Sequence, residues 1–550
     1  MKQFLPLLFL LPSLSTLVAQ TLPTGFVNES VAAVGAPTAL AFTPDGRLLV
    51  TTQGGALRVV KSGTLLATPA LSFNGLATGA DPKICSNSER GLLGVAVDPQ
   101  FVSNHYIYLY YTARNGSTCQ TGLYVDGSGS YATVGRPVNR VSRFTLGSND
   151  LVDPTTELVL VNNMPSPGGN HNAGDVHFGK DGYLYISIGD GGSDYAGDSG
   201  AAGSNDAARD KHVLTGKILR VTSTGGIAPG NPFTGAGTGV CAITGATTAG
   251  NHCQETFAWG LRNPFRFAMD PNAVNTRFFI NDVGQGAWEE VDEAAAGADY
   301  GWYCREGAHV NSSTGKCSPT PPAMVDPIFE YPHGAAVVPG TAINNCNSIT
   351  GGAFVPNGVW PSAYDNTYLL ADFICGAVFA IPVTGPPTSV VATASTFASG
   401  LGGSSATSLR FGPYGSTANA QALYYTSYAA GVSRIRFVRR LDIDDDGNVD
   451  AATDALLVQR YLIGLRGGAL IDGARGVNAR RDATAIANYL AALGNALDID
   501  GDGSVKATTD GLLLLRYLLG LRGAALTNGA VATAITPTAV ENYLLTLLLP

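Results

Sequence analysis

A single histidine stands in a run of small and amide residues. Residues 168–174 read Gly-Gly-Asn-His-Asn-Ala-Gly, and Gly-Asp-Gly-Gly follows at residues 189–192. Glycines around His171 keep the backbone clear, so a large ligand can approach the imidazole. Histidine titrates near neutral pH and is a natural general base there. The pattern predicts proton abstraction by His171, although a lone histidine is more often an ordinary turn or core residue.

A second polar cluster, Gly-Leu-Arg-Asn-Pro-Phe, occupies residues 260–265. Arg262 lies beside Asn263, and Pro264 stiffens the chain that follows them. The guanidinium and the amide together offer several donors to an anionic or carbonyl oxygen. The alternative is a turn that carries a surface ion pair.

A third cluster, Asp-Val-Gly-Gln-Gly-Ala-Trp-Glu-Glu-Val-Asp, occupies residues 282–292. Its glycine-rich start exposes backbone carbonyls, and its carboxylates are hard oxygen ligands of the kind that calcium prefers. The run therefore indicates a calcium site, with ordinary loop acids as the competing interpretation.

Two acidic loops near the C-terminus follow calcium-loop spacing, with oxygen ligands at alternate positions and a glycine where the chain turns. The first loop contains Asp442, Asp444, Asp446 and Asp454, and the second contains Asp498, Asp500, Asp502 and Asp510. In each loop the last acid comes one place later than in an EF-hand, and Lys506 stands where the first loop has Asp450. Three carboxylates this close repel one another unless a cation lies between them. We therefore expect two calcium loops, the second binding more weakly.

The elements that must position these residues recur along the chain. An apolar strand, a turn rich in Asp, Pro and Gly, and a second apolar strand begin near residues 39, 93, 175, 266, 352 and 408. Repeated hairpins, each too small to fold alone, are typical of propeller blades. We expect an all-β six-bladed β-propeller over residues 25–438, since a β-sandwich would not need six similar units.

The composition changes after Phe437. Each acidic loop precedes a segment with helical apolar spacing, residues 455–464 and residues 511–520. Residues 440–550 are therefore predicted to form a small all-α calcium-binding module. A loop that precedes a helix, repeated in tandem, resembles a dockerin, and this resemblance implies a cohesin-like or cell-surface partner.

Bulk properties restrict the protein class. The chain has 550 residues, a net charge of −9, 69 Gly and 30 Pro, which favours many short strands and argues against a nucleic-acid partner. A lysine, a short apolar run and small residues at the N-terminus predict a signal peptide over residues 1–19. No later segment has the length of a membrane span. A secreted or periplasmic location is expected.

The 8 cysteines are even in number and form no Cys-x-x-Cys motif, so disulfides are expected in an oxidising compartment. Cys241 with Cys253, and Cys304 with Cys317, would close short loops. Cys85 with Cys119, and Cys346 with Cys375, are the remaining pairs.

The polar clusters follow one another in an order that resembles the glucose/sorbosone dehydrogenase family. The motifs that carry the resemblance are His-Asn at 171–172, Asp-Gly-Tyr-Leu-Tyr at 181–185, Gly-Asp-Gly-Gly at 189–192, Gly-Lys-Ile-Leu-Arg at 216–220, Gly-Leu-Arg-Asn-Pro-Phe at 260–265, Asp-Val-Gly-Gln at 282–285, Trp-Glu-Glu-Val-Asp at 288–292 and Tyr-Gly-Trp at 300–302. The resemblance covers roughly residues 25–438. It implies a dehydrogenase that oxidises the anomeric carbon of an aldose with pyrroloquinoline quinone (PQQ) and calcium.

The resemblance also implies a role for each matching residue. His171 would be the general base, and Arg262 would stabilise negative charge on the quinone oxygen. The implied cofactor contacts are Gln53, Asn263, Gly284 and Gln285, and the implied calcium ligands are the carbonyls of Gly284 and Gln285 and the side chains of Glu289 and Glu290.

The chain departs from the soluble glucose dehydrogenases at the cofactor's carboxylates, which those enzymes hold with a lysine and two arginines. The corresponding stretches here read Phe-Ile-Cys-Gly at 373–376 and Ser-Ser-Ala-Thr-Ser-Leu at 404–409. Asp175 and Gly191 also replace residues that contact substrate or cofactor. In these respects the chain is closer to the hedgehog-interacting-protein-like branch. The alternative function is a non-catalytic extracellular propeller that binds a carbohydrate or a protein; a propeller hydrolase or lactonase ranks behind it.

Overall fold

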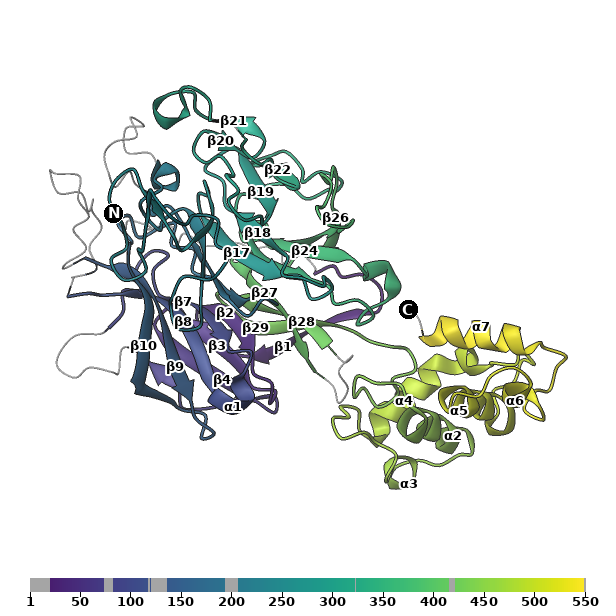
Figure 1. Ribbon diagram of the computed structural model, residues 1–550. Helices are drawn as coiled ribbons and strands as arrows, with labels where there is room; N and C mark the ends of the chain where they lie inside the picture. Colours follow the sequence, from purple (N-terminus) through teal and green to yellow (C-terminus); the bar gives the residue numbers. More distant parts are fainter. Residues whose placement is uncertain are drawn as a thin grey trace, which may run out of the picture.

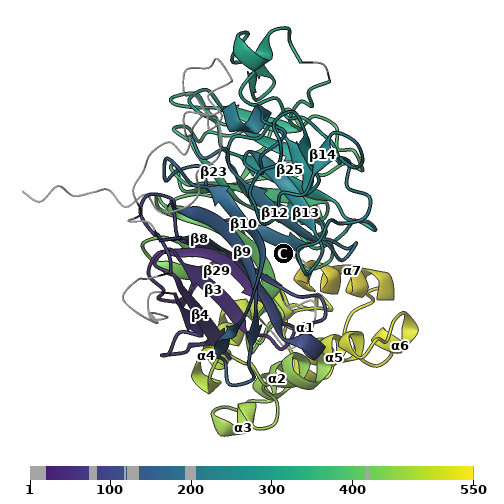
Figure 2. The same cartoon turned by 60° about the vertical axis from the view of Figure 1, so that its left-hand side comes forward.

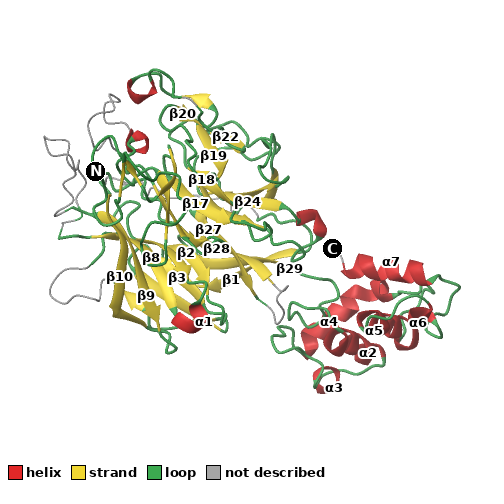
Figure 3. Ribbon diagram, in the orientation of Figure 1, coloured by secondary structure: helices red, strands yellow, loops and turns green. Residues whose placement is uncertain are grey.

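Strands and helices occupy separate parts of the chain in the computed structural model. The model describes residues 20–73, 83–116, 119, 136–192, 206–321, 323–414 and 421–548. Strands belong to the region before residue 438, and the helical repeats follow it (Figures 1 and 3). The predicted signal peptide, residues 1–19, lies outside the described residues.

Six antiparallel sheets surround a central channel and confirm the six-bladed propeller. The first three are β2(Pro37–Phe42), β3(Leu48–Thr52), β4(Ala56–Lys61), β5(Thr64–Leu65) and β6(Leu71–Ser72); β7(Leu92–Val97), β8(Tyr106–Ala113), β9(Val138–Leu146) and β10(Val152–Pro165); and β11(Val176–Phe178), β12(Leu184–Ile188), β13(Lys217–Val221) and β16(Thr256–Trp259). The fourth and fifth are β17(Pro264–Met269), β18(Phe278–Asp282), β19(Trp288–Glu293) and β22(Phe329–Pro332); and β23(Ile349–Phe354), β24(Thr367–Asp372), β25(Ala377–Pro382) and β26(Ser395–Ala398). The first strand of each sheet contains or adjoins one of the six repeats predicted from the sequence.

The sixth sheet joins the two ends of the propeller. It contains β27(Ser405–Pro413), β28(Gln421–Ser427), β29(Gly431–Phe437) and β1(Phe26–Ala32), so the first strand of the chain pairs with the last strand of the ring. Phe26 of β1 packs edge-on against Trp360, Tyr364, Phe397 and Phe437. Aromatic burial of this kind holds β1 in place as the outer strand of the sixth sheet and so closes the ring.

Alternating side chains on the strands build the cores between neighbouring sheets. The first strands of the sheets, β2, β7, β11, β17, β23 and β27, lie around the channel; neighbouring blades contact one another through them, and the third and fourth blades through β12 and β17. Figure 2 shows the blades from a second direction. Small elements outside the blades are β14(Thr238–Gly239) with β15(His252–Cys253), β20(Arg305–Glu306) with β21(His309–Val310), and α1(Phe101–Asn104).

The C-terminal region is helical and has its own apolar core, as predicted. Its elements are α2(Leu456–Leu462), α3(Gly468–Ile471), α4(Ala483–Leu493), α5(Leu512–Leu518), α6(Ala524–Thr527) and α7(Pro537–Leu548). The predicted helices at 455–464 and 511–520 are α2 and α5, which end earlier because Gly464 and Gly520 adopt left-handed φ values of 91° and 88°. A π-helical turn precedes each of them, at Ala451–Ala455 and Ala507–Gly511.

All four predicted disulfides are present: Cys85–Cys119, Cys241–Cys253, Cys304–Cys317 and Cys346–Cys375. Each closes a loop of the propeller. Among the described helices, none combines the length and the apolar character that crossing a membrane requires.

Candidate functional site

A cavity of about 490 Å³ opens at one end of the central channel. Its walls are the first residues of the inner strands and the loops that lead into them. Predicted site residues that line it are Gln53, His171, Arg262, Asn263 and Gly284. Residues contributed by all six blades thus converge on one space of the size that small-molecule sites usually have.

His171 lies in the wall of this cavity and is held in one orientation. Its Nδ1 is 2.6 Å from Oδ1 of the fully buried Asp190, whose Oδ2 accepts a 2.9 Å hydrogen bond from Nε1 of Trp302. The His171 backbone has a left-handed φ of 51°, which costs free energy for a residue other than glycine. A Cβ on Gly189 would lie 2.1 Å from the His171 carbonyl oxygen, so this glycine allows close packing behind the imidazole.

Arg262 and Asn263 are positioned through their backbones by one carboxylate. Asp282 accepts the N–H of Arg262 at 2.8 Å and that of Asn263 at 2.6 Å. The Arg262 guanidinium also donates to the Val283 carbonyl at 2.8 Å and lies 5.5 Å from the Trp302 ring. The indole therefore contacts both the arginine and the partner of the histidine.

Asp282 belongs to a buried acidic cluster with Glu290 and Asp292. Asp282 of β18 pairs with Glu290 of β19, and Asp292 lies two residues further along β19, so all three side chains project from the same face. Their oxygens lie within 4.8 Å of one another. Burial, and then the neighbouring carboxylates, raise the pKa of Glu290 and of Asp292 well above the usual range. Oε2 of Glu290 and both oxygens of Asp292 have no partner among the described residues. Buried carboxylate oxygens in this state fit a hard cation such as calcium.

Glu289, the other predicted ligand of this run, points elsewhere. Its Oε1 is 2.5 Å from Nε2 of His333, and its Oε2 accepts the N–H groups of Gly284 at 3.2 Å and Ile349 at 3.0 Å. Burial raises the pKa of Glu289 to about 7. These bonds tie the glycine-rich turn to the start of β23.

Glu306, which the sequence reasoning missed, organises that turn. Its Oε1 accepts the N–H groups of four consecutive residues, Gln285, Gly286, Ala287 and Trp288, at 2.7–3.2 Å. Burial alone would raise the pKa of Glu306, but these four bonds favour its charged form and lower the pKa. Gln285 is thus fixed through its backbone beside the cavity.

Glu89 is a second residue that the motifs did not reveal. It lines the cavity, its Oε2 accepts the His171 N–H at 2.8 Å, and Nδ2 of Asn263 approaches the same oxygen at 3.5 Å. Next to Glu89 in the chain, the Ser88 carbonyl accepts from Nε2 of Gln53 at 2.5 Å, and Oε1 of Gln53 accepts from the Tyr428 hydroxyl. Glu89 therefore contacts both His171, the predicted base, and Asn263, although it belongs to none of the sequence motifs.

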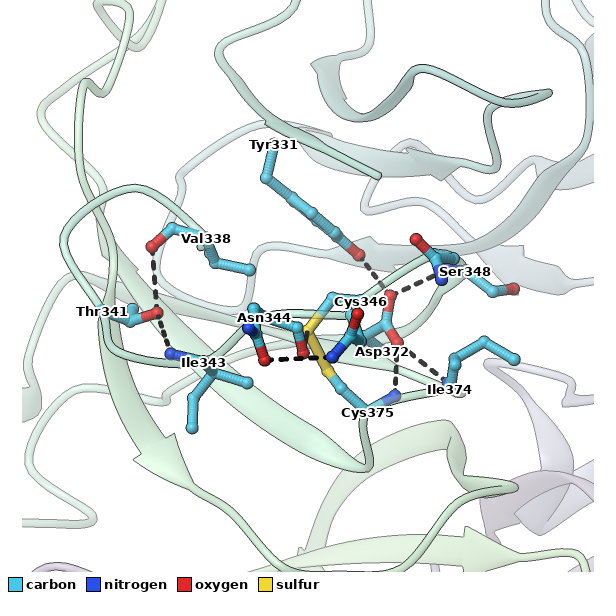
Figure 4. Close-up of a disulfide and its surroundings, with 12 residues drawn as sticks. Tyr331, Val338, Thr341, Ile343, Asn344, Cys346, Ser348, Asp372, Ile374 and Cys375 are labelled. Atoms are coloured by element: carbon cyan, nitrogen blue, oxygen red, sulfur yellow. Dashed lines mark hydrogen bonds between the residues drawn. A yellow bond between two sulfur atoms is a disulfide. The ribbon is translucent and has the colours of Figure 1, made fainter. Parts of the chain in front are cut away.

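The fifth and sixth blades present uncharged residues to the cavity, namely Phe373, Ser404 and Thr407. Figure 4 shows how the turn after β24 is held there. Asp372 accepts the Tyr331 hydroxyl at 2.9 Å and the N–H groups of Ser348, Ile374 and Cys375 at 2.8–2.9 Å, next to the Cys346–Cys375 disulfide. The turn that carries Phe373 is therefore rigid.

In each C-terminal acidic loop the structure gathers three of the four predicted ligands. The groups are Asp442, Asp444 and Asp454, and Asp498, Asp500 and Asp510. Asp446 and Asp502 stand outside these groups; Oδ2 of Asp502 accepts from Nζ of Lys506 at 2.7 Å. The π-helical turns contain Asp454 and Asp510, so the extra residue noted in the spacing is accommodated as a wider turn. Burial raises the pKa of Asp442 to about 7 and that of Asp454 to about 8.

Fold and cavity together define a six-bladed propeller that has a histidine–aspartate pair at the channel mouth. The model of the family described as "Glucose / Sorbosone dehydrogenase" matches residues 34–350. The chain belongs to this family.

Curated relatives include the HIPL2 protein of Arabidopsis thaliana, 27% identical over 54% of this chain and 44% of that protein. The aldose sugar dehydrogenase YliI of Escherichia coli is 29% identical over 48% of this chain and 58% of that enzyme. The chain thus spans about half the length of these relatives.

A solved structure titled as a putative oxidoreductase (glucose dehydrogenase) from Thermus thermophilus covers 75% of this chain and 100% of its own, with 26% identity and a TM-score of 0.51. The PQQ-bound aldose sugar dehydrogenase of Streptomyces coelicolor covers 76% of this chain and 99% of its own, with 22% identity and a TM-score of 0.50, and shows the same fold.

Proposed function

We propose that this protein is a PQQ- and calcium-dependent dehydrogenase that oxidises the anomeric carbon of an aldose sugar. The observation that carries the proposal is the His171–Asp190 pair in the cavity wall. Because Asp190 accepts a hydrogen bond from Nδ1–H of His171, Nε2 is the imidazole nitrogen left to accept a proton. A base of fixed orientation in a cavity of this volume suits abstraction of a hydroxyl proton from a bound sugar.

The residues around the cavity fit the cofactor that the family implies. Nε of Arg262 and Nε of Arg266 are buried and have no partner among the described residues, so each can donate to an oxygen-rich ligand. PQQ, when bound, would accept the hydride that leaves the sugar. Arg262 would stabilise negative charge on a ligand oxygen, and Asn263 would contribute an amide.

Calcium is proposed in two places. In the propeller, the buried oxygens of Glu290 and Asp292 are the ligand atoms that the contacts support, with Asp282 connecting them to Arg262. The carbonyls of Gly284 and Gln285 remain proposed ligands at the cavity, whereas Glu289 has its bonds to His333, Gly284 and Ile349. In the C-terminal module, each acidic loop would hold one ion.

The proposed organisation is a secreted or periplasmic protein with a signal peptide at residues 1–19, a catalytic propeller over 25–438 and a dockerin-like module over 440–550. The four disulfides support an oxidising compartment. The module would attach the enzyme to a cohesin-like or cell-surface partner.

A second candidate function is a non-catalytic propeller that binds an extracellular carbohydrate or protein. The uncharged side chains of Phe373, Ser404 and Thr407 favour it, because an anionic cofactor gains no charge partner from that side of the cavity.

The test is to titrate the purified protein with PQQ in excess calcium and to measure dye reduction with a panel of aldoses. His171→Ala should lower the rate by about a hundred- to ten-thousandfold and leave PQQ affinity nearly unchanged. Arg262→Ala should weaken both rate and PQQ affinity. Wild-type protein that oxidises no aldose would favour the second candidate.

A further inference from the structure

The cavity continues into the channel as a deeper layer. A void of about 10 Å³, with room for about one water molecule, follows it along the inner strands. On β17 the cavity is lined by Phe265 and Arg266, and the deeper void by Arg266 and Phe267. The side chain of Arg266 is common to both spaces and therefore forms the boundary between them.

Arg266 carries a buried positive charge without a carboxylate partner. Its side chain donates to the carbonyls of Phe265 at 2.8 Å, Thr38 at 2.7 Å and Leu93 at 3.2 Å. Within the described part of the chain its Nε has no partner, and the carboxylate that acts on it electrostatically is Asp175 of the deeper layer. The residue is only 3% exposed. Because a guanidinium stays protonated in proteins, the charge persists even though burial lowers its pKa.

The deeper layer adds to this charge. Arg410 donates to Nδ1 of His177 at 3.0 Å, and Nε2 of His177 lies 3.0 Å from Oδ2 of Asp175. With Nδ1 accepting and Nε2 donating, the imidazole is neutral. Arg266 and Arg410 are positive and Asp175 is negative, so this layer has one net positive charge.

Other charges at the cavity do not balance Arg266. Within the described lining, the positive side chains are Arg262 and Arg266 and the acidic one is Glu89. Glu89 instead accepts a hydrogen bond from the backbone N–H of His171. Desolvated guanidinium groups that leave a net positive charge at the end of a cavity attract an anion strongly.

We propose that Arg266 is the anion-binding end of the cavity and holds a carboxylate group of the bound ligand. The identification of this ligand as PQQ rests on the proposed function. The anion site itself does not depend on it. It makes Arg266, on the inner strand of the fourth blade, a residue that decides which ligands the cavity accepts.

The experiment compares PQQ with its trimethyl ester, which keeps the ring system and loses the carboxylate charges. Binding is followed by titration calorimetry in the presence of calcium, with the full-length chain. Wild-type protein should prefer PQQ by about ten- to a hundredfold, the value expected of one charge-assisted hydrogen bond. Arg266→Met should lose most of this preference and keep its affinity for the ester.

Two further variants separate binding from folding. Arg266→Lys keeps the charge without the planar fork and should retain part of the preference. Arg410→Met removes a guanidinium from the deeper layer that does not line the cavity, and should retain most of it. A folded Arg266→Met protein with an unchanged preference for PQQ would overturn the proposal, and so would a wild-type protein that binds PQQ and the ester equally well.

Benzene-1,3,5-tricarboxylate distinguishes the anion site from the cofactor. If wild-type protein binds this probe but not PQQ, and Arg266→Met loses the probe, the anion site stands and the dehydrogenase proposal fails. A folded wild-type protein that binds none of the carboxylates overturns both.

Discussion

Arg436 and Asp445 form a two-point ion pair between the last strand of the propeller and the first acidic loop. The guanidinium nitrogens lie 2.7 and 2.9 Å from the carboxylate oxygens. Nε of Arg436 also donates to Glu29 of β1 at 2.7 Å. One side chain therefore connects β1, which closes the ring, β29, which precedes the loop, and the loop itself.

This connection predicts that Arg436→Met destabilises the protein. The side chains of Arg436 and Asp445 are only 5% and 11% exposed, so the carboxylate left behind is largely buried and keeps only the more distant Arg480, 3.9 Å away, as an ion-pair partner among the described residues. Loss of one partner of such a pair costs about 3–5 kcal/mol. Urea unfolding should show the loss, and Asp445→Asn combined with Arg436→Met should recover part of it. Additive effects of the two substitutions would show that the pair is not coupled.

The second acidic loop is predicted to gain calcium affinity from Lys506→Asp. Lys506 places its ammonium 2.7 Å from Oδ2 of Asp502 and so brings a competing cation to the loop. In the first loop the same position is Asp450, which accepts the N–H groups of Ala452 and Thr453. The substitution removes the competing cation and supplies the missing cap.

Calorimetric calcium titration of the full chain should show the weaker of two site classes tighten, with the stronger class unchanged. Asp442→Ala with Asp444→Ala serves as the reference in which the second loop is the only intact acidic loop of the C-terminal module, with the propeller sites unchanged. The assignment would be contradicted if the two loops bound calcium with equal affinity in wild-type protein, or if Lys506→Asp left both affinities unchanged.

His252 is predicted to make the propeller sensitive to acid. Its ring stacks on Phe233 at 3.9 Å, and its buried Nδ1 has no described partner. Burial, with Lys211 and Lys217 nearby, lowers the pKa of His252 from 6.5 to about 4. Between these values the unfolded chain binds more protons than the folded one, so stability falls as the pH decreases from about 6.5 to about 4.

The measurement is the difference in melting temperature between wild-type protein and His252→Phe across that pH range, since carboxylates titrate in the same window. The phenyl ring keeps the stack on Phe233 and cannot be protonated. The difference should grow in favour of the variant as the pH falls. The exposed His105→Asn is the matched control, since it also removes one histidine of the propeller.

Local patterns were enough to predict the elements of this fold. The hairpin around residues 39–50 and its five counterparts each combine an apolar strand, a turn rich in Asp, Pro and Gly and a second apolar strand, and each became the inner part of a blade. The position of β1 could not be predicted in this way, because it belongs to the sixth sheet through a pairing with β29 that spans the whole propeller. Helices α4 and α7 were also missed, since no acidic loop precedes them.

The site shows the same division between local and long-range information. The motifs singled out His171, Arg262 and Asn263, which line one cavity. Glu89 carries no motif signal, and its role depends on a contact between the second and third blades. Asp282 and Glu290 belong to one motif, yet only the register of β18 and β19 shows that they face each other and leave Glu289 to His333.

The last prediction concerns the partner of the proposed base. Asp190 fixes the tautomer of His171 through the 2.6 Å contact at Nδ1, and Trp302 in turn holds Asp190. Asp190→Asn keeps the shape but allows the amide to donate to Nδ1, which would leave the proton on Nε2 and remove the base from the cavity. We expect a loss in kcat of about a hundred- to ten-thousandfold, with PQQ affinity retained. Trp302→Phe removes the hydrogen bond to Asp190 and keeps an aromatic ring beside Arg262, so it should lower kcat less and shift the pH–rate profile. A profile and a rate that Asp190→Asn leaves unchanged would show that His171 does not act as the base.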